Sequence, residues 1–141
     1  MAKEIKRILL IEPKSPNYHV FSKFTIPRLG LPQLGAILKR EGYDVKILFE
    51  EAENNKKMDY KKIEDYKPDL VGISTITSTA PHAYSIADRV RELLKVPVVF
   101  GGAHPSFMPE EALMHGDYVV RKEGDISFPQ LIKTLAKNGG L

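Results

Sequence analysis

Three short apolar runs in the second half of the chain each end in glycine, hydroxyl or charged residues. The first run leads into five hydroxyl side chains within six residues, Ser74, Thr75, Thr77, Ser78 and Thr79. Hydroxyls donate and accept hydrogen bonds without carrying charge, so the cluster suits the edge of a neutral polar ligand. The alternative is that Ser78 or Thr79 caps a following helix, but a cap needs only one hydroxyl. The cluster therefore predicts a loop that faces a ligand.

The second and third apolar runs end in glycines beside polar residues. The second ends in Gly101-Gly102-Ala103-His104-Pro105. Because glycine has no side chain, a ligand can approach the backbone closely here, although a tight turn with positive φ would explain the same pair. The third run ends in Arg121-Lys122-Glu123-Gly124-Asp125, where the last residue could cap a helix. We expect His104 and the Glu123-Gly124 turn to lie at the same site as the glycine pair.

Several kinds of chemistry are excluded by the residue types present. The chain has no cysteine, so it supplies no disulfide, thiolate nucleophile or iron–sulfur ligand. Its four histidines, at positions 19, 82, 104 and 115, lack the spacing of metal ligands, and we expect no metal held by side chains of this chain. The chain meets neither the glycine pattern of dinucleotide-binding folds nor that of the P-loop. No serine lies in the nucleophile elbow of a hydrolase. A response regulator would carry an aspartate where the third predicted strand ends in Ser74.

Charge and hydropathy narrow the class of partner. The net charge of +3 is small, and the lysines are scattered without interleaved aromatic residues, so we expect no nucleic-acid binding. The longest apolar runs are about six residues, whereas a membrane span needs ~20, so we expect no membrane partner. The charged N-terminus is not followed by the apolar segment of a signal peptide. These features predict a cytoplasmic location.

Strand and helix patterns alternate five times along the chain. Strands are predicted at residues 5–11, 45–49, 70–74, 96–100 and 118–120, and helices at 30–41, 60–66, 81–94, 109–115 and 126–137. Short apolar strands without internal alternation are typical of a parallel sheet covered on both faces. The pattern predicts a doubly wound α/β fold with a five-stranded parallel sheet in the flavodoxin-like order 2-1-3-4-5. Ligands of such sheets bind beyond the carboxyl ends of the strands, which is where the three polar segments fall.

Five segments follow one another in a distinctive order: residues 28–38 (Arg-Leu-Gly-Leu-Pro-Gln-Leu-Gly-Ala-Ile-Leu), 42–45 (Gly-Tyr-Asp-Val), 68–74 (Pro-Asp-Leu-Val-Gly-Ile-Ser), 101–105 (Gly-Gly-Ala-His-Pro) and 123–125 (Glu-Gly-Asp). Together they resemble the cobalamin-binding N-terminal domain of B12-dependent radical SAM enzymes. The resemblance implies a cobalamin-binding domain over residues 1–137 and the start of a linker at 138–141. It also implies an adjoining C-terminal radical SAM domain that holds S-adenosylmethionine and a [4Fe-4S] cluster, in a methyltransferase or cyclase. This chain alone would then bind its cofactor without catalysing a reaction.

The resemblance also implies a site for cobalamin. The dimethylbenzimidazole tail would thread between the third and fourth strands, with His104 and the Glu123-Gly124 turn near the nucleotide or the corrin edge. The cofactor-binding residues implied are Ser74, Thr75, Ile76, Thr77, Gly101, Gly102, His104, Glu123 and Gly124. Other cobalamin proteins carry D-x-H-x-x-G after the first strand, whereas residues 17–22 keep only His19, so we expect base-off cobalamin without a protein histidine on cobalt. The alternative is a flavodoxin-like module that binds another small ligand or a protein partner.

Overall fold

The sheet has the predicted number, direction and order of strands. The computed structural model describes residues 4–14, 30–50 and 58–137. All strand pairs are parallel, in the order β2-β1-β3-β4-β5. The strands are β1 (Arg7–Glu12), β2 (Asp44–Phe49), β3 (Leu70–Ser74), β4 (Val98–Gly101) and β5 (Tyr118–Val119). This confirms the doubly wound α/β fold and its flavodoxin-like strand order.

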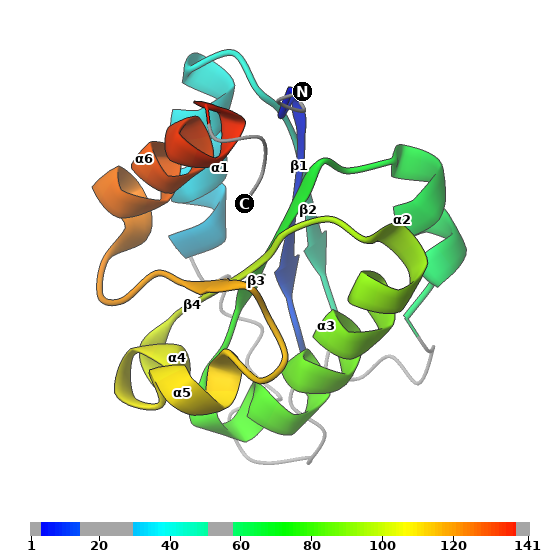
Figure 1. Ribbon diagram of the computed structural model, residues 1–141, viewed down its shortest axis with the longest axis vertical. Coiled ribbons are helices and arrows are strands. Elements are labelled where there is room, and N and C mark those ends of the chain that lie inside the picture. The colour runs from blue at the N-terminus through cyan, green and yellow to red at the C-terminus, as the bar shows by residue number, and fades with distance from the viewer. Residues whose placement is uncertain (1–3, 15–29, 51–57, 138–141) are drawn as a thin grey trace.

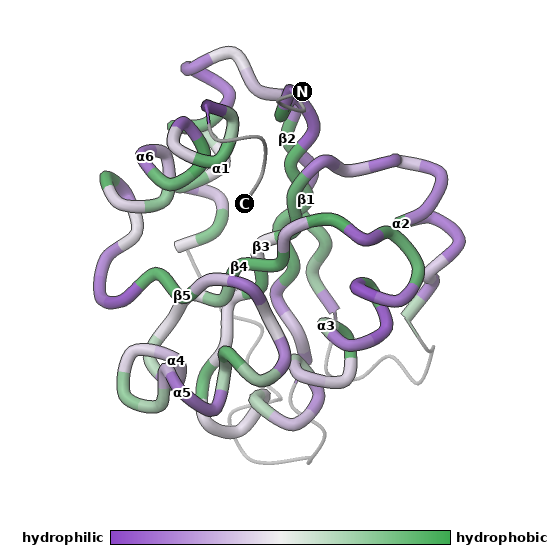
Figure 2. The backbone as a smooth tube through the Cα atoms, viewed as in Figure 1, coloured by the Kyte–Doolittle hydropathy of each residue, from purple (hydrophilic) through white to green (hydrophobic). Residues whose placement is uncertain are grey.

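Helices cover both faces of the sheet, as Figure 1 shows. The helices α1 (Gly30–Arg40) and α6 (Gly124–Lys137) lie on one face, and α2 (Tyr60–Tyr66) and α3 (Ala80–Leu94) lie on the other. Successive side chains of a strand point to opposite faces. In β1, therefore, Ile8 and Leu10 pack toward α1 and α6, whereas Leu9 and Ile11 pack toward α3. The strands that carry these residues form the hydrophobic centre of the molecule in Figure 2.

The segment after β4 differs from the prediction. Two short helices occupy it, α4 (Ala103–Phe107) and α5 (Pro109–Ala112), where a loop and one longer helix at 109–115 were expected. The loop prediction was wrong for His104 because α4 starts directly after Gly102, and a helix of five residues carries no periodic apolar pattern. Strand β4 begins at Val98 rather than at residue 96. Proline has no N–H to donate to a ladder, which suits Pro97 to the position before a strand.

The helix caps considered as alternatives at Asp125 and Thr79 are not formed. Helix α6 begins at Gly124, so Asp125 lies in its first turn rather than at the cap position. Thr79 precedes α3, yet its hydroxyl makes no cap bond to that helix and instead accepts from the Ile76 N–H at 3.0 Å. The hydroxyl thereby closes the turn Thr77–Thr79 between β3 and α3.

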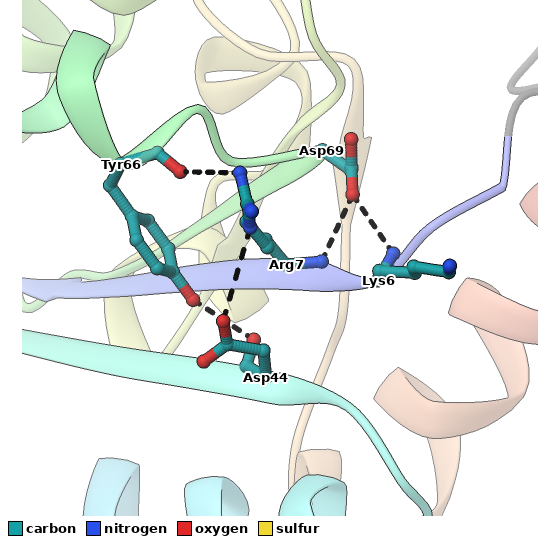
Figure 3. A network of polar contacts seen from close by, with 5 residues as sticks. All are labelled: Lys6, Arg7, Asp44, Tyr66 and Asp69. Atoms are coloured by element: carbon teal, nitrogen blue, oxygen red, sulfur yellow. Dashed lines mark hydrogen bonds and ion pairs between the residues drawn. The ribbon is translucent and has the colours of Figure 1, made fainter.

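A polar network joins three strands at their amino ends, as Figure 3 shows. The Asp69 carboxylate, directly before β3, accepts from the backbone N–H groups of Lys6 and Arg7 at 2.9 Å each. The Arg7 guanidinium donates to the Tyr66 carbonyl at 3.3 Å and lies 3.9 Å from the Asp44 carboxylate. The Tyr66 hydroxyl donates to the Asp44 carbonyl at 3.0 Å. These contacts fix the amino edge of the sheet, opposite the edge where ligands of this fold class bind.

No helix in the described part of the chain is long and apolar enough to cross a membrane.

Candidate functional site

A pocket of about 420 Å³ opens at the carboxyl ends of β3 and β4, on the face covered by α1 and α6. Alternation along the strands places Gly72, Ser74 and Gly101 on this face, and the small size of Ser74 and Gly101 leaves space under the two helices. The residues that line the pocket are Leu10, Gly30, Leu31, Gln33, Leu34, Gly72, Ile73, Ser74, Val99, Phe100, Gly101, Gly102, Val120, Lys122, Glu123, Gly124, Asp125 and Phe128. The pocket therefore lies where the topology predicts a ligand.

The three glycines at β3 and β4 that line the pocket, Gly72 within β3, Gly101 at the end of β4 and Gly102 directly after it, have different surroundings. A Cβ at Gly72 would lie 2.9 Å from Leu10 Cδ2 and 3.3 Å from the Phe128 ring, so this glycine lets α6 approach the sheet. A Cβ at Gly102 would lie 2.5 Å from the Thr75 carbonyl oxygen, and its φ of 104° favours glycine. A Cβ at Gly101 would meet no atom within 4 Å. Gly101 thus exposes bare backbone to the open pocket, and any side chain there would project into free space.

The pocket lies over the strands and not between them. Strands β3 and β4 are adjacent, with Ser74 opposite Gly101, and the Thr75 N–H donates to the Gly101 carbonyl at 2.9 Å. The expectation that a ligand passes between these strands was wrong in that form, because a ladder of backbone hydrogen bonds closes the gap. A ligand can instead lie on the exposed backbone at Gly101.

Five of the nine predicted site residues line this pocket: Ser74, Gly101, Gly102, Glu123 and Gly124. The other four, Thr75, Ile76, Thr77 and His104, do not line it but continue from the same strand ends. The Thr75 side chain is fully buried, and its hydroxyl has no hydrogen-bond partner among the described residues. The His104 N–H donates to the Thr75 carbonyl at 3.3 Å, which ties α4 to the end of β3. The nine residues therefore form two adjoining groups at one edge of the sheet.

His104 is held from both sides of its ring. Its Nε2 lies 2.9 Å from the Glu111 carboxylate, and its Nδ1 lies 3.3 Å from the Thr77 hydroxyl. Tyr84 of α3 lies nearby, with its ring centroid 6.3 Å from that of His104. Burial, and then the negative charge of Glu111, raise the pKa of Tyr84 to about 12. The imidazole thus joins the turn after β3 to α5.

The other described histidines are also paired with carboxylates. His82, at the start of α3, lies 2.7 Å from Glu50 at the end of β2. His115 lies 2.9 Å from Asp88 and stacks on Tyr84 with 4.4 Å between ring centroids. Within residues 4–14, 30–50 and 58–137, no group of three or more histidine, aspartate or glutamate side chains could hold a metal ion. His19 lies outside the described residues.

Sequence reasoning missed the residues that the helices contribute to the pocket. Leu31 and Leu34 have helical spacing, but that spacing does not distinguish a pocket wall from the core. The Gln33 amide donates to the Asp125 carboxylate at 3.1 Å, which joins α1 to α6 at the pocket. No sequence signal predicts this contact, since 92 positions separate the two residues. Lys122 was also missed, and it has a positive φ of 61°.

The pocket combines apolar walls with polar groups at its borders. Leucine, valine and phenylalanine side chains line the walls, and Ser74, Gln33 and Asp125 contribute polar atoms. Pockets that hold organic ligands and cofactors typically have this composition and measure about 300–1,000 Å³. The arrangement suits an organic ligand with a largely apolar body and polar substituents.

Comparison with known proteins identifies the family. The model of the B12 binding domain matches residues 20–132. The chain belongs to the B12-binding domain family. This confirms the resemblance found in the sequence and identifies cobalamin as the cofactor of the domain.

Relatives of this B12-binding domain include methyltransferases. The domain is 36% identical over 140 residues to an uncharacterized methyltransferase of Pyrococcus horikoshii, covering 96% of this chain and 30% of that protein. It is 46% identical over 70 residues to bacteriochlorophyllide d C-8(2)-methyltransferase of Chlorobaculum tepidum, covering 50% of this chain and 15% of that protein. The B12-binding domain therefore spans less than a third of the length of these relatives.

The fold of the B12-binding domain also matches a solved structure. OxsB, a cobalamin-dependent S-adenosylmethionine radical enzyme solved with aqua-cobalamin and S-adenosylmethionine bound, superposes with a TM-score of 0.76 at 24% identity. The match covers 98% of this chain and 19% of OxsB. The doubly wound fold of the B12-binding domain is thus shared with one segment of a much longer chain.

Proposed function

We propose that this B12-binding domain holds cobalamin with the base of its nucleotide tail in the pocket over Gly101. The observation that carries the proposal is the open space above the Gly101 backbone, next to a glycine whose own Cβ would collide with Thr75. Gly101 keeps the floor of the pocket open, and Gly102 keeps the following turn close to β3. Gly101 and Gly102 therefore have separate roles in one ligand site.

The chain's own residues can hold each part of such a tail. Leu10, Val99 and Phe128 provide apolar surface for the faces and edges of the base. The Ser74 hydroxyl and the Gln33 amide provide hydrogen-bonding groups at the border of the pocket. When bound, cobalamin supplies the cobalt-centred chemistry, and the protein positions it and excludes water.

We propose that the remaining predicted residues contact the part of cobalamin outside the pocket. Thr75, Ile76, Thr77 and His104 continue from the same strand ends as Ser74 and Gly102. Ile76, Thr77 and His104 would make these contacts directly. The Thr75 side chain is fully buried, so Thr75 would act through its backbone carbonyl, which accepts from the His104 N–H.

We propose further that cobalamin is bound base-off and without a protein histidine on cobalt. A base held in the pocket cannot coordinate cobalt at the same time. The D-x-H-x-x-G pattern that carries such a histidine in other cobalamin proteins is not met at residues 17–22, which keep only His19. We assign no cobalt ligation to His19.

The relatives support a role within a longer enzyme. We propose that the whole protein transfers a methyl group and that an adjoining radical SAM domain holds S-adenosylmethionine and the [4Fe-4S] cluster. The names of the relatives favour methyl transfer over ring formation. The cluster must be held elsewhere, because this chain has no cysteine. The chain alone is expected to bind cobalamin without turnover.

The visible absorption of the domain after incubation with hydroxocobalamin and desalting tests the proposal. Retained corrin bands in the wild type that are lost in Gly101→Trp, which fills the pocket, would support it. Lys61→Trp is the matched control, because it adds the same ring at an exposed position of α2, on the other face of the sheet. Equal retention by both variants would contradict the pocket assignment. After reduction to Co(II), nitrogen splitting in the electron paramagnetic resonance spectrum would contradict base-off binding without histidine.

A further inference from the structure

Ser106 of α4 connects the two loops that form one side of the pocket. Its hydroxyl donates to the Gly102 carbonyl at 2.8 Å and accepts from the Lys122 N–H at 2.9 Å. Its carbonyl accepts from the Arg121 guanidinium at 3.2 Å. Gly102 lies in the loop after β4, and Lys122 lies in the loop after β5. One half-buried hydroxyl therefore forms the bridge between the two loops.

The sheet itself does little to hold these loops together. Strand β5 has two residues, and its pairing with β4 consists of Val99 opposite Tyr118 and Phe100 opposite Val119. The last backbone bond between the strands runs from the Val120 N–H to the Phe100 carbonyl at 2.8 Å. Beyond that bond β4 and β5 no longer pair with each other, although Gly101 still pairs with Ser74 of β3. The position of the loop after β5 relative to the loop after β4 therefore depends on side-chain contacts.

The loop after β5 also has a backbone conformation that needs support. Lys122 has a φ of 61°, in the left-handed region that disfavours residues with a Cβ. The N–H group that donates to the Ser106 hydroxyl belongs to Lys122. Strained backbone conformations persist where surrounding contacts fix them. The Ser106 hydroxyl is such a contact, and Glu123, Gly124 and Asp125 of the pocket follow directly.

We infer that Ser106 is a positioning residue for the cofactor pocket: its hydroxyl sets the separation between the Gly101-Gly102 loop and the Lys122–Asp125 loop. Ser106 does not line the pocket and acts through the residues that do. The inference rests on the proposed function for the identity of the ligand, but the link between the loops can be measured without any ligand.

Ser106→Ala removes both hydroxyl bonds and tests the inference in the full chain. We expect hydrogen exchange at the Lys122 amide to become about tenfold faster without cofactor, because the amide loses its acceptor. We expect hydroxocobalamin to bind about fivefold more weakly, the effect of losing one hydrogen bond's net contribution. Ser106→Thr keeps a hydroxyl and should restore both values. Ser127→Ala is the control, since it removes an exposed hydroxyl of α6 that does not line the pocket.

The outcomes separate this inference from the proposed function. Unchanged exchange at Lys122 in Ser106→Ala would overturn the inference, and so would wild-type affinity for hydroxocobalamin. A wild-type protein that does not bind hydroxocobalamin would instead overturn the proposed function, with the exchange measurement still testing the loop link. If Ser106→Ala does not fold, Ser106→Cys keeps the volume with a weaker hydrogen-bonding group. It should then show faster exchange at the Lys122 amide and weaker binding of hydroxocobalamin than the wild type, and wild-type values for both would overturn the inference.

Discussion

The Gly102 Cα faces the Thr75 carbonyl oxygen so closely that a Cβ would lie 2.5 Å from it, whereas a Cβ on neighbouring Gly101 would meet nothing within 4 Å. Gly102 also has a φ of 104° and a ψ of −176°, a conformation almost confined to glycine. We expect Gly102→Ala to lower the free energy of unfolding by about 2–4 kcal/mol, from backbone strain and the collision. Urea denaturation measures this. Gly101→Ala is the matched control and should change stability by less than about 1 kcal/mol; equal losses in both variants would contradict the assignment.

Asp69 should make a measurable contribution to stability from the amino edge of the sheet. Its carboxylate accepts from two backbone N–H groups at the start of β1. Asp69→Ala leaves both without this acceptor, and we expect a loss of about 1–2 kcal/mol in the free energy of unfolding. Asp65→Ala removes an exposed carboxylate paired with Lys61 and should cost less than about 0.5 kcal/mol. Cobalamin retention should survive both changes, because both residues are remote from the pocket. A loss of unfolding free energy in Asp69→Ala no larger than that in Asp65→Ala would count against the network.

Tyr84 should make the domain sensitive to alkaline pH. Burial, and then Glu111, raise the pKa of Tyr84 from 10.0 to about 12 in the folded protein. Below pH 10 the phenol is neutral in both states and its contribution to stability is complete. Between pH 10 and 12 the unfolded chain loses its proton first, so stability falls as the pH rises. The urea midpoint of the wild type should therefore fall more between pH 9 and pH 11.5 than that of Tyr84→Phe.

Part of the alkaline loss should remain in the Tyr84 variant. Burial is the largest cause that raises the pKa of Tyr66 to about 12 as well, so Tyr66 loses its contribution over the same pH range. If the urea midpoint fell equally between pH 9 and pH 11.5 in the wild type and in Tyr84→Phe, the environment of Tyr84 would differ from the one described.

His104 offers a test of the second group of predicted site residues. His104→Gln removes the imidazole that joins Thr77 to Glu111. If the group contacts cobalamin as proposed, the variant should bind hydroxocobalamin at least about fivefold more weakly, the effect of one lost hydrogen bond. Glu111→Gln is the control, because it perturbs the same imidazole from the side of α5. Equal weakening in both variants would indicate that the imidazole acts only by holding the helices.

The fold was predictable because its signals are local. Runs such as Leu70–Ser74 are strongly apolar, and right-handed crossovers leave few strand orders for five alternating units. The positions of Gly101 and Gly102 at a strand end were sufficient to predict where the pocket opens. The separate roles of the two glycines were not predictable, since they depend on atoms of Thr75 and on the free space under α1 and α6.

The parts that were missed depend on contacts distant in sequence or on short elements. The five residues of α4 give too little pattern to distinguish a helix from a loop. The Gln33–Asp125 bond joins residues that only the folded chain brings together. One available signal went unused. Successive side chains of a strand point to opposite faces of the sheet, so the neighbouring hydroxyls of Ser74 and Thr75 would be expected on different faces if the alternation of β3 continues past Ser74.

At the carboxyl ends of β3 and β4, the two faces of the sheet differ in the size of the side chains that they carry. Over the carboxyl half of β3 and β4, one face carries Gly72 and Gly101, and the other carries Ile73 and Phe100 in the buried cluster with α3. A lineage of such domains could therefore vary Gly101, where a Cβ would meet no atom within 4 Å, and with it the group accepted under the proposed function, while the second face kept its packing. Mutational tolerance should follow the same division, with substitutions at Gly101 changing ligand preference and substitutions at Phe100 changing whether the domain accumulates in cells.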